Sequence, residues 1–212
     1  IRHLQRSLVA MSTQLEFFFD CSSPWTYMAF TRIQPIAERH RVTINWKPVL
    51  VGGVFNAVNQ GLYAARESMF NNEQRLAHYM KDLQDWANYC HIDIGWPSFH
   101  PVNSVKAMRG CFVAEEQGLL LPYATAVFES YWGRQEDISK DDILGSILDR
   151  PSVRIDKVDF FEKIQSQNYK DKLRTNTEEL IERGGYGSPT LFINKHDMYF
   201  GNDRLPLVER KL

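Results

Sequence analysis

The stretch Leu15 to Tyr27 reads LEFFFDCSSPWTY. Its first five residues, LEFFF, are apolar and rich in aromatics, which favours a buried β-strand. The pattern breaks at DCSSP, and apolar residues at helical spacing resume from Trp25. Pro24 suits the first position of a helix, where its missing N–H costs nothing, and this leaves Ser23 as the N-cap. The sequence therefore predicts a strand, a tight turn and a helix over residues 24–40.

Ser23 has two interpretations. Free N–H groups and the positive end of the helix dipole favour an anion at a helix N-terminus, and a thiolate held there has a lowered pKa. A plain capping serine fits the same residues, so this stretch alone leaves both interpretations open. Cys21 lies two residues earlier without a second cysteine nearby, and we expect it to be a packed residue.

The composition narrows the class of protein. The chain has 212 residues, of which 43% are hydrophobic, and this fits one large domain or one domain with an insertion. A net charge of -1 argues against a nucleic-acid-binding surface, and no apolar run is long enough to cross a membrane. Residues 1–10 are interpreted as an upstream extension or a cloning remnant, with a transit peptide as the alternative, and are excluded from the fold prediction.

The cysteines and histidines carry no metal or disulfide pattern. There are three widely spaced cysteines, Cys21, Cys90 and Cys111, and no C-x-x-C motif. This predicts neither a disulfide framework, a thioredoxin-type redox pair nor a zinc ribbon, so a reducing, cytoplasmic compartment is expected. His100 has no companion at metal-ligand spacing, and no metal site is expected.

The order of the elements predicts the fold class. Residues 42–48 alternate as a second strand, and Pro35 predicts a bend or an end within the first helix. Residues 52–173 show helical patterning. The chain then returns to a helix at 175–183, strands at 189–193 and 198–200, and a last helix at 204–212. We therefore predict an α/β protein whose thioredoxin-like β-α-β…α-β-β-α domain (residues 11–51 and 174–212) holds a large all-helical insertion (residues 52–173).

Several motifs carry a family resemblance. FFFDCSSPWTYMA, GYGSPTLFIN, FGNDRL and PVNSVKAMR, taken in order, resemble segments of the 2-hydroxychromene-2-carboxylate isomerases and the kappa-class glutathione transferases. These proteins form a branch of the DsbA-like thioredoxin folds. The resemblance covers nearly all of residues 15–212, and it implies glutathione as cofactor, an aromatic small-molecule substrate and a homodimer.

The resemblance also assigns roles to single residues. It implies that Ser23 hydrogen-bonds the glutathione sulfur. It implies that Ser188 pairs its backbone with the cysteinyl part of glutathione, and that Pro189, which follows it, is cis. Asn202 and Asp203 fall where the family holds the γ-glutamyl end.

Other positions depart from the family pattern or carry two interpretations. An asparagine that contacts glutathione in the family is replaced here, so Gln60 or Asn59 must substitute for it. The family lysine that contacts the glycyl carboxylate is missing from residues 75–78, RLAH. Lys47, at the end of the second strand, is a candidate for binding a carboxylate or is a solvated lysine. Asn103 is a candidate substrate contact or a helix cap, and Trp86, Trp96 and Trp132 are expected in the core.

Three functions follow from the resemblance. The first is a glutathione-dependent cis-trans isomerase of 2-hydroxychromene-2-carboxylate or a similar aromatic pyruvate, in which the glutathione thiolate adds, a bond rotates and the thiolate leaves. The second is a kappa-class transferase that conjugates glutathione to electrophiles. The third, which the departures from the family pattern keep open, is a non-catalytic thioredoxin-like binding module.

Overall fold

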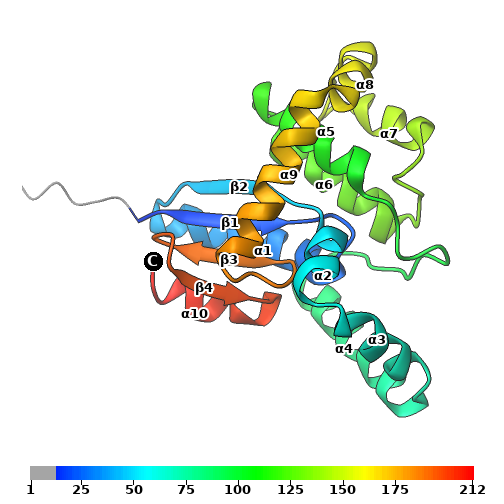
Figure 1. Cartoon of the computed structure of the whole chain (residues 1–212), viewed down its shortest axis with the longest axis vertical. Coiled ribbons are helices and arrows are strands. Elements are labelled where there is room, and N and C mark those ends of the chain that lie inside the picture. Colours follow the sequence, from blue (N-terminus) through cyan, green and yellow to red (C-terminus); the bar gives the residue numbers. More distant parts are fainter. Residues whose placement is uncertain (1–12) are drawn as a thin grey trace, which may run out of the picture.

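The computed structural model describes residues 13–212, whose strands form one mixed sheet in the order β2-β1-β3-β4 (Figure 1). The predicted extension and the first two residues of the predicted domain lie outside this range. The central strand β1 (Leu15–Phe19) pairs parallel with β2 (Ile44–Pro48) and antiparallel with β3 (Thr190–Ile193). Strand β4 (Asp197–Phe200) adds to the far side of β3. The predicted thioredoxin-like order is confirmed.

Strand β1 is buried along its whole length because helices cover both faces of the sheet. On one face Phe17 and Phe19 belong to the large core that includes α1 (Pro24–His40) and α10 (Leu205–Glu209). On the other face Phe18 packs among residues of α2 (Val51–Val58) and α9 (Gln167–Glu182). Figure 1 shows α9 in front of the sheet and α1 behind it. The alternation of side chains along a strand explains this division.

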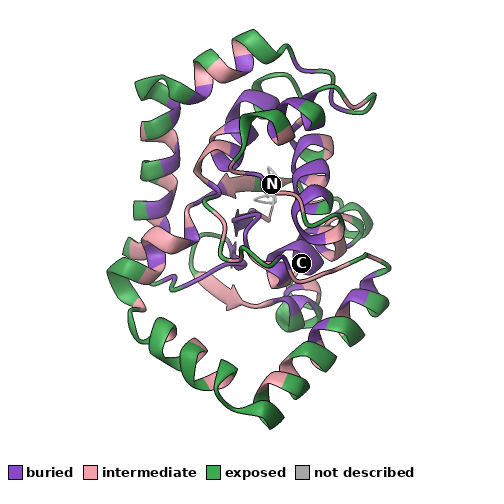
Figure 2. Ribbon diagram, turned by 90° about the vertical axis from the view of Figure 1, so that its right-hand side faces the viewer, coloured by how far each residue is buried: buried purple, intermediate pink, exposed green. Residues whose placement is uncertain are grey.

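The predicted helical insertion is confirmed, and it has two parts. The part nearer the core holds α5 (Val105–Glu116), α6 (Leu120–Phe128), a π-helix (Glu129–Gly133), α7 (Asp141–Leu148) and α8 (Lys157–Gln165). The other part is a hairpin of α3 (Gly61–Phe70) and α4 (Glu73–Cys90), which projects from the molecule (Figures 1 and 2). Helix α3 has no buried residue, so the hairpin tip depends little on core packing.

The predicted boundary between residues 173 and 174 falls inside one continuous helix. Helix α9 begins at Gln167 and not at the predicted residue 175, because no proline or glycine interrupts residues 167–182. Its buried Leu173 joins the large core. The same core passes from α1 into α6, where the rings of Tyr27 and Phe128 stack with centroids 4.9 Å apart. The inner helices of the insertion therefore share their core with the sheet.

Helix α1 continues through Pro35 over 17 residues. The predicted span of residues 24–40 is confirmed, and the helix does not end at Pro35, because Pro35 is exposed and the residues on either side of it still pack one face of the helix against the core. Proline costs the helix one hydrogen bond, which this packing outweighs. Within residues 13–212 no helix is both long and apolar enough to cross a membrane.

Candidate active site

The Ser23 hydroxyl stands between the start of α1 and the segment before β3. Its oxygen accepts a hydrogen bond from the Thr26 N–H at 3.2 Å, which makes Ser23 the N-cap of α1. The same hydroxyl donates to the carbonyl oxygen of Ser188 at 3.3 Å. The hydroxyl is half-buried. Two segments 165 residues apart in the chain therefore meet at one oxygen atom.

Ser188 fixes this meeting point through its side chain. Its hydroxyl accepts from the Asp20 N–H at 3.0 Å and shares a 2.8 Å hydrogen bond with the Thr26 hydroxyl. The Ser188–Pro189 peptide bond is cis. Among the described residues, no group accepts a hydrogen bond from the Ser188 N–H. The side chain of Ser188 therefore makes the bonds that hold this segment, and its backbone N–H is left as a possible donor.

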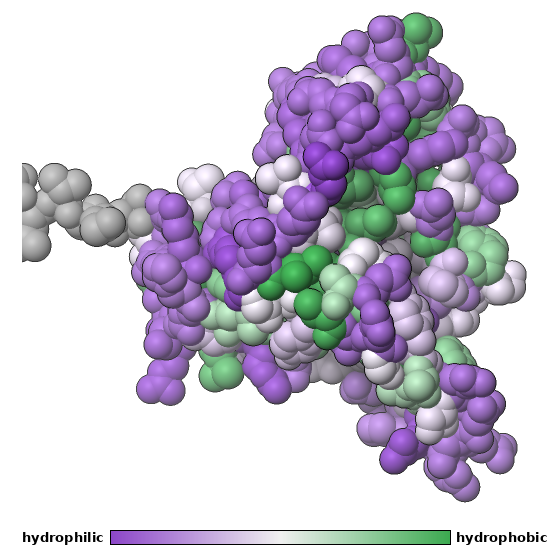
Figure 3. All heavy atoms as spheres, in the orientation of Figure 1, coloured by the Kyte–Doolittle hydropathy of each residue, from purple (hydrophilic) through white to green (hydrophobic). Residues whose placement is uncertain are grey.

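A cavity of about 940 Å³ opens beside this turn. Its walls come from the β1–α1 turn, helices α2, α3 and α4, the loop before α5, the segment before β3 and the end of β4. Its larger side chains are mainly aromatic: Trp25, Phe55, Tyr63, Phe70, Tyr79, Trp96, Tyr186 and Phe200. Figure 3 shows hydrophobic residues gathered around α2, between the polar surfaces of the upper helices and the hairpin. The volume and the apolar lining suit a small organic ligand.

The carboxylate of Asp20 joins three elements at the base of this cavity. It is fully buried, and it accepts hydrogen bonds from the Ser22 N–H at 2.9 Å, the Val51 N–H at 2.8 Å and the Ser104 hydroxyl at 3.1 Å. These donors belong to the turn, the first residue of α2 and the start of α5. Burial raises the pKa of Asp20 above its ordinary 3.8, although the backbone donors act in the opposite direction.

His100 and Arg66 form a second polar pair in the cavity wall. A guanidinium only donates, so the contact of 2.8 Å between Arg66 and His100 Nε2 makes Nε2 the acceptor. The ring proton then lies on Nδ1 and points at the hydroxyl oxygen of Tyr131, 2.7 Å away. The imidazole is therefore neutral. Burial, and secondly the charge of Arg66, lowers the pKa of His100 to about 4.

The shifted pKa of His100 predicts a pH dependence of stability. The unfolded chain binds this proton below about pH 6.5, whereas the folded chain binds it only near pH 4. The free energy of unfolding should therefore fall as the pH drops from 6.5 to 4. Denaturant titrations at several pH values should show a smaller fall for His100→Gln than for the wild type. His78→Gln, at an exposed position in α4, is the control, and an equal effect of both variants would contradict the prediction.

The chain is similar to known protein families over nearly its whole described length. The family of DSBA-like thioredoxin domains matches residues 14–212. The chain belongs to this family. It is also 27% identical over 197 residues to 2-hydroxychromene-2-carboxylate isomerase of Pseudomonas putida, with 92% of each chain covered. It is 26% identical over 210 residues to glutathione S-transferase kappa 1 of Caenorhabditis elegans, which covers 92% of this chain and 88% of the relative.

Solved structures agree on the fold of this DSBA-like protein. A 2-hydroxychromene-2-carboxylate isomerase superposes with a TM-score of 0.78 at 24% identity, over 93% of each chain. The cytosolic disulfide reductase DsbM of Pseudomonas aeruginosa, solved with glutathione, superposes with a TM-score of 0.64 at 13% identity. This match covers 93% of this chain and 96% of the reductase.

The structure brings some of the sequence-predicted site residues of this DSBA-like domain together. Ser23, Ser188 and Asn103 all line the cavity. Asn103 Oδ1 accepts from the Val105 N–H at 3.1 Å, so its side chain closes an Asx turn just before α5, whose N-cap residue is Ser104. Of the two amides offered for the missing family asparagine, Asn59 lines the cavity. Gln60 is exposed and bonds the carbonyl of Asn56 at 2.8 Å.

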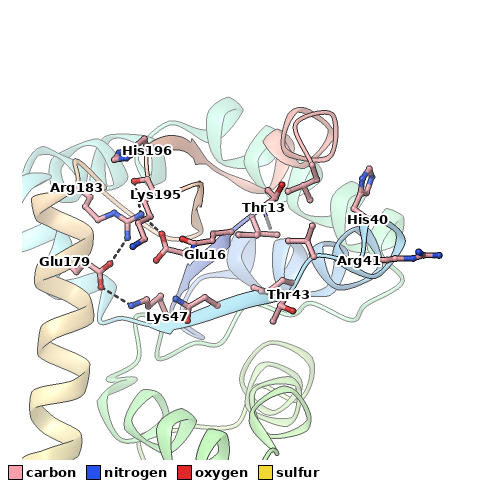
Figure 4. A pocket seen from close by; sticks show the side chains of 16 residues that line it. Thr13, Glu16, His40, Arg41, Thr43, Lys47, Glu179, Arg183, Lys195 and His196 are labelled. Carbon is pink, nitrogen blue, oxygen red and sulfur yellow. Dashed lines mark hydrogen bonds and ion pairs between the residues drawn. The ribbon is translucent and has the colours of Figure 1, made fainter. Parts of the chain in front are cut away.

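Lys47 lies in a different groove, at the side of the sheet that α9 covers (Figure 4). Its ammonium pairs with Glu179 at 3.1 Å, and Arg183 bonds Glu179 and the buried Glu16 at 2.6 and 2.5 Å. Side-chain alternation along β2 turns Lys47 toward α9, and Glu179 already neutralises its charge. The structure therefore does not bring Lys47 to Ser23.

Asn202 and Asp203, at the helical turn after β4 (Asn202–Arg204), do not line the cavity either. Asn202 is buried, and its side-chain and backbone oxygens accept from Arg32 at 2.7 and 3.0 Å. Arg32 lies nine residues after Ser23, which is about 13 Å along a helix. The exposed Asp203 pairs with Arg204 at 2.6 Å. Asn202 thus has a structural bond to α1, and Asp203 faces solvent.

Three residues that line the cavity, Trp96, Asp20 and Arg66, were not predicted from the sequence, whereas Trp132 and Cys21 lie where they were expected. Trp132 is in the core as expected, where its indole N–H donates to the Cys21 carbonyl at 2.9 Å, but Trp96 lines the cavity. Cys21 is a packed residue as expected, since it is fully buried, and burial raises the pKa of its thiol. The sequence carries a signal that could have identified Asp20 as a site residue, because a carboxylate directly after a buried strand is unusual. Arg66 had none in the sequence.

Proposed function

We propose that this protein binds glutathione in the cavity beside Ser23 and uses it to isomerise an aromatic pyruvate such as 2-hydroxychromene-2-carboxylate. The observation that carries the proposal is the position of the Ser23 hydroxyl. It lies at the N-terminus of a 17-residue helix, 3.3 Å from the Ser188 carbonyl, at the edge of an aromatic cavity. The relatives named isomerases and glutathione transferases support the same reading.

The residues around Ser23 fit a cysteinyl peptide group. An extended peptide needs one backbone donor and one backbone acceptor from its partner, and Ser188 offers both beside the serine hydroxyl. The side chain of Ser188 holds this backbone in place through Asp20 and Thr26. A sulfur atom next to Ser23 would also face the positive end of the α1 dipole, which favours its ionised form.

Ser23 would act as a hydrogen-bond donor to the sulfur. Its oxygen keeps the bond from the Thr26 N–H, while its proton, which the structure directs at the Ser188 carbonyl over a long 3.3 Å, can turn to a nearby thiolate. When bound, glutathione supplies the nucleophilic thiolate. The surrounding aromatic side chains, including Trp25 and Tyr79, would pack against the substrate ring and exclude water.

Net transfer of glutathione to an electrophile is the second candidate. The chain is 26% identical to the kappa-class transferase of Caenorhabditis elegans, against 27% for the Pseudomonas putida isomerase. The apolar cavity would also accept an uncharged electrophile. The two candidates share the binding site and differ in whether glutathione is consumed.

Two measurements on the purified protein test these candidates. Calorimetry should show binding of glutathione. Ser188→Pro should abolish it and Ser188→Ala should weaken it less, because both variants lose the hydroxyl that bonds Asp20 and Thr26 but only proline also loses the N–H donor. A chromene absorbance assay with catalytic glutathione should show turnover without loss of glutathione. Conjugation of a generic electrophile instead would favour the transferase. Activity in neither assay, together with no binding of glutathione, would reject both and favour a binding module.

A further inference from the structure

Arg66 is the one lysine or arginine among the described residues that line the cavity. The one acidic residue in the same lining, Asp20, already accepts bonds from three protein donors. Within residues 13–212 no carboxylate lies within 4.0 Å of the Arg66 guanidinium. Arg66 is half-buried in this lining, so its guanidinium can offer an unshared positive charge to an anionic ligand in the cavity.

His100 holds this cation in one orientation. It accepts one N–H of Arg66 at 2.8 Å through Nε2, and Tyr131 fixes the ring from the other side at 2.7 Å. Trp96 packs against the imidazole with ring centroids 4.8 Å apart. A guanidinium has five N–H donors, so the bond to His100 leaves the others for a second acceptor. Two parallel N–H donors of this kind match a carboxylate.

We propose that Arg66, positioned by His100, is the specificity-determining residue that binds a carboxylate in the cavity. The proposal rests on the proposed function, which supplies two sources of a carboxylate: the acidic substrate and the glycyl end of glutathione. The substrate carboxylate and the glycyl carboxylate would each accept the same pair of N–H donors from the Arg66 guanidinium. His100 contacts no ligand in this scheme and acts through Arg66, because its neutral ring accepts the bond that orients the guanidinium.

Two matched ligand pairs distinguish the sources. The first pair is 2-naphthoate and 2-naphthamide, which share a ring system and differ in charge, and whose binding is followed by tryptophan fluorescence because Trp25 and Trp96 line the cavity. The second pair is glutathione and its glycyl ethyl ester, measured by calorimetry. Arg66→Gln should weaken the charged member of one pair about 10- to 100-fold and change its neutral member less than about twofold. The pair that responds identifies the source.

Matched variants separate charge recognition from other effects. Arg75→Gln removes the same charge from the exposed face of neighbouring α4 and should leave both pairs unchanged. His100→Phe should reduce the selectivity for the charged member, and His100→Gln should restore part of it because its amide oxygen can accept from Arg66. Equal selectivity of these two His100 variants would overturn the positioning role.

The outcomes also separate this inference from the proposed function. If neither pair distinguishes the wild type from Arg66→Gln while glutathione binds, the assignment of Arg66 is wrong and the proposed function stands. If glutathione does not bind to the wild type but naphthoate selectivity is lost in Arg66→Gln, the proposed function fails and the assignment of Arg66 stands. Loss of selectivity in Arg75→Gln as well would reduce the effect to general surface charge and overturn the assignment.

Discussion

Replacing Ser23 with alanine should lower turnover at neutral pH about ten- to a hundredfold. One hydrogen bond to a charged group contributes about 1.5–3 kcal/mol, which corresponds to about one to two pH units in the pKa of the bound thiol. The affinity for glutathione should change less, because the proposed bonds from the Ser188 N–H and carbonyl to the cysteinyl peptide group would not involve the Ser23 hydroxyl. Rates measured against pH, with thiolate absorbance in parallel, should show part of the loss recovered at higher pH, where the thiolate forms without help.

The stability cost of the same substitution needs a separate control. Ser23 also caps α1, and loss of a cap costs about 0.5–2 kcal/mol. Asp156 caps α8 in the same way, accepting from the Asp159 N–H at 2.8 Å, in the helical lobe at the top of Figure 1. Asp156→Ala should therefore reproduce the loss of stability without the change in the pH profile.

A second control changes the chemistry of the position. Ser23→Cys places a thiol where thioredoxins keep their nucleophile, and we expect it to form a mixed disulfide with oxidised glutathione in place of turnover. Mass spectrometry of the intact protein detects this product. If Ser23→Ala leaves the rates and the thiolate titration unchanged, Ser23 is only a helix cap, and the proposed mechanism loses its central residue.

The ends of the chain were predictable because local signals agree there. The aromatic run of β1, the Ser23–Pro24 helix start and the hairpin around residues 194–197 each mark their own element. Their order then predicts the thioredoxin-like sheet. The resemblance adds the position of Ser188 beside Ser23, which local patterns could not supply for two residues so far apart in the chain.

The cavity was less predictable because its walls come from distant segments. In the sequence Arg66 has no feature that distinguishes it from other helical arginines. It lies in the cavity wall because the loop before α5 brings His100 within hydrogen-bond distance of it. Lys47 illustrates the opposite case. Its position at the end of a strand suggested a ligand, but strand alternation and Glu179 on α9 place it in another groove. The direction of the side chain and its partners far along the chain determine where Arg66 and Lys47 lie, and a local sequence pattern predicts neither of these.

Asp20→Asn should lower the free energy of unfolding by about 1–3 kcal/mol, the cost of one buried donor left without a partner. The substitution keeps the shape of the side chain. The oxygen that accepts from Ser22 can be retained, but an NH₂ group then faces the Val51 N–H, and two donors cannot bond each other. The Ser104 hydroxyl can turn and accept instead. The lost partner is therefore the N–H of Val51, the first residue of α2.

Because the pKa of Asp20 is raised, the stability difference between the wild type and Asp20→Asn should depend on pH. A protonated Asp20 can keep all three bonds, because its proton can point to the Ser104 oxygen. The pH-dependent part of the stability that Asp20 contributes is therefore complete below about pH 3.8 and is lost as the pH rises through the raised pKa of the folded state. The asparagine variant does not titrate at this position. The gap between the two proteins should narrow as the pH rises.

The control for Asp20→Asn is Asp156→Asn. Both aspartates accept a backbone N–H, but Asp156 is exposed, and asparagine serves as well as aspartate at a helix N-cap. Denaturant unfolding should show a loss for Asp20→Asn and almost none for Asp156→Asn. Because α2 forms one wall of the cavity, glutathione affinity should fall only in the first variant. Equal stability of both variants at every pH would mean that the Val51 N–H finds another acceptor, and that the Asp20 carboxylate does not hold α2 to the site.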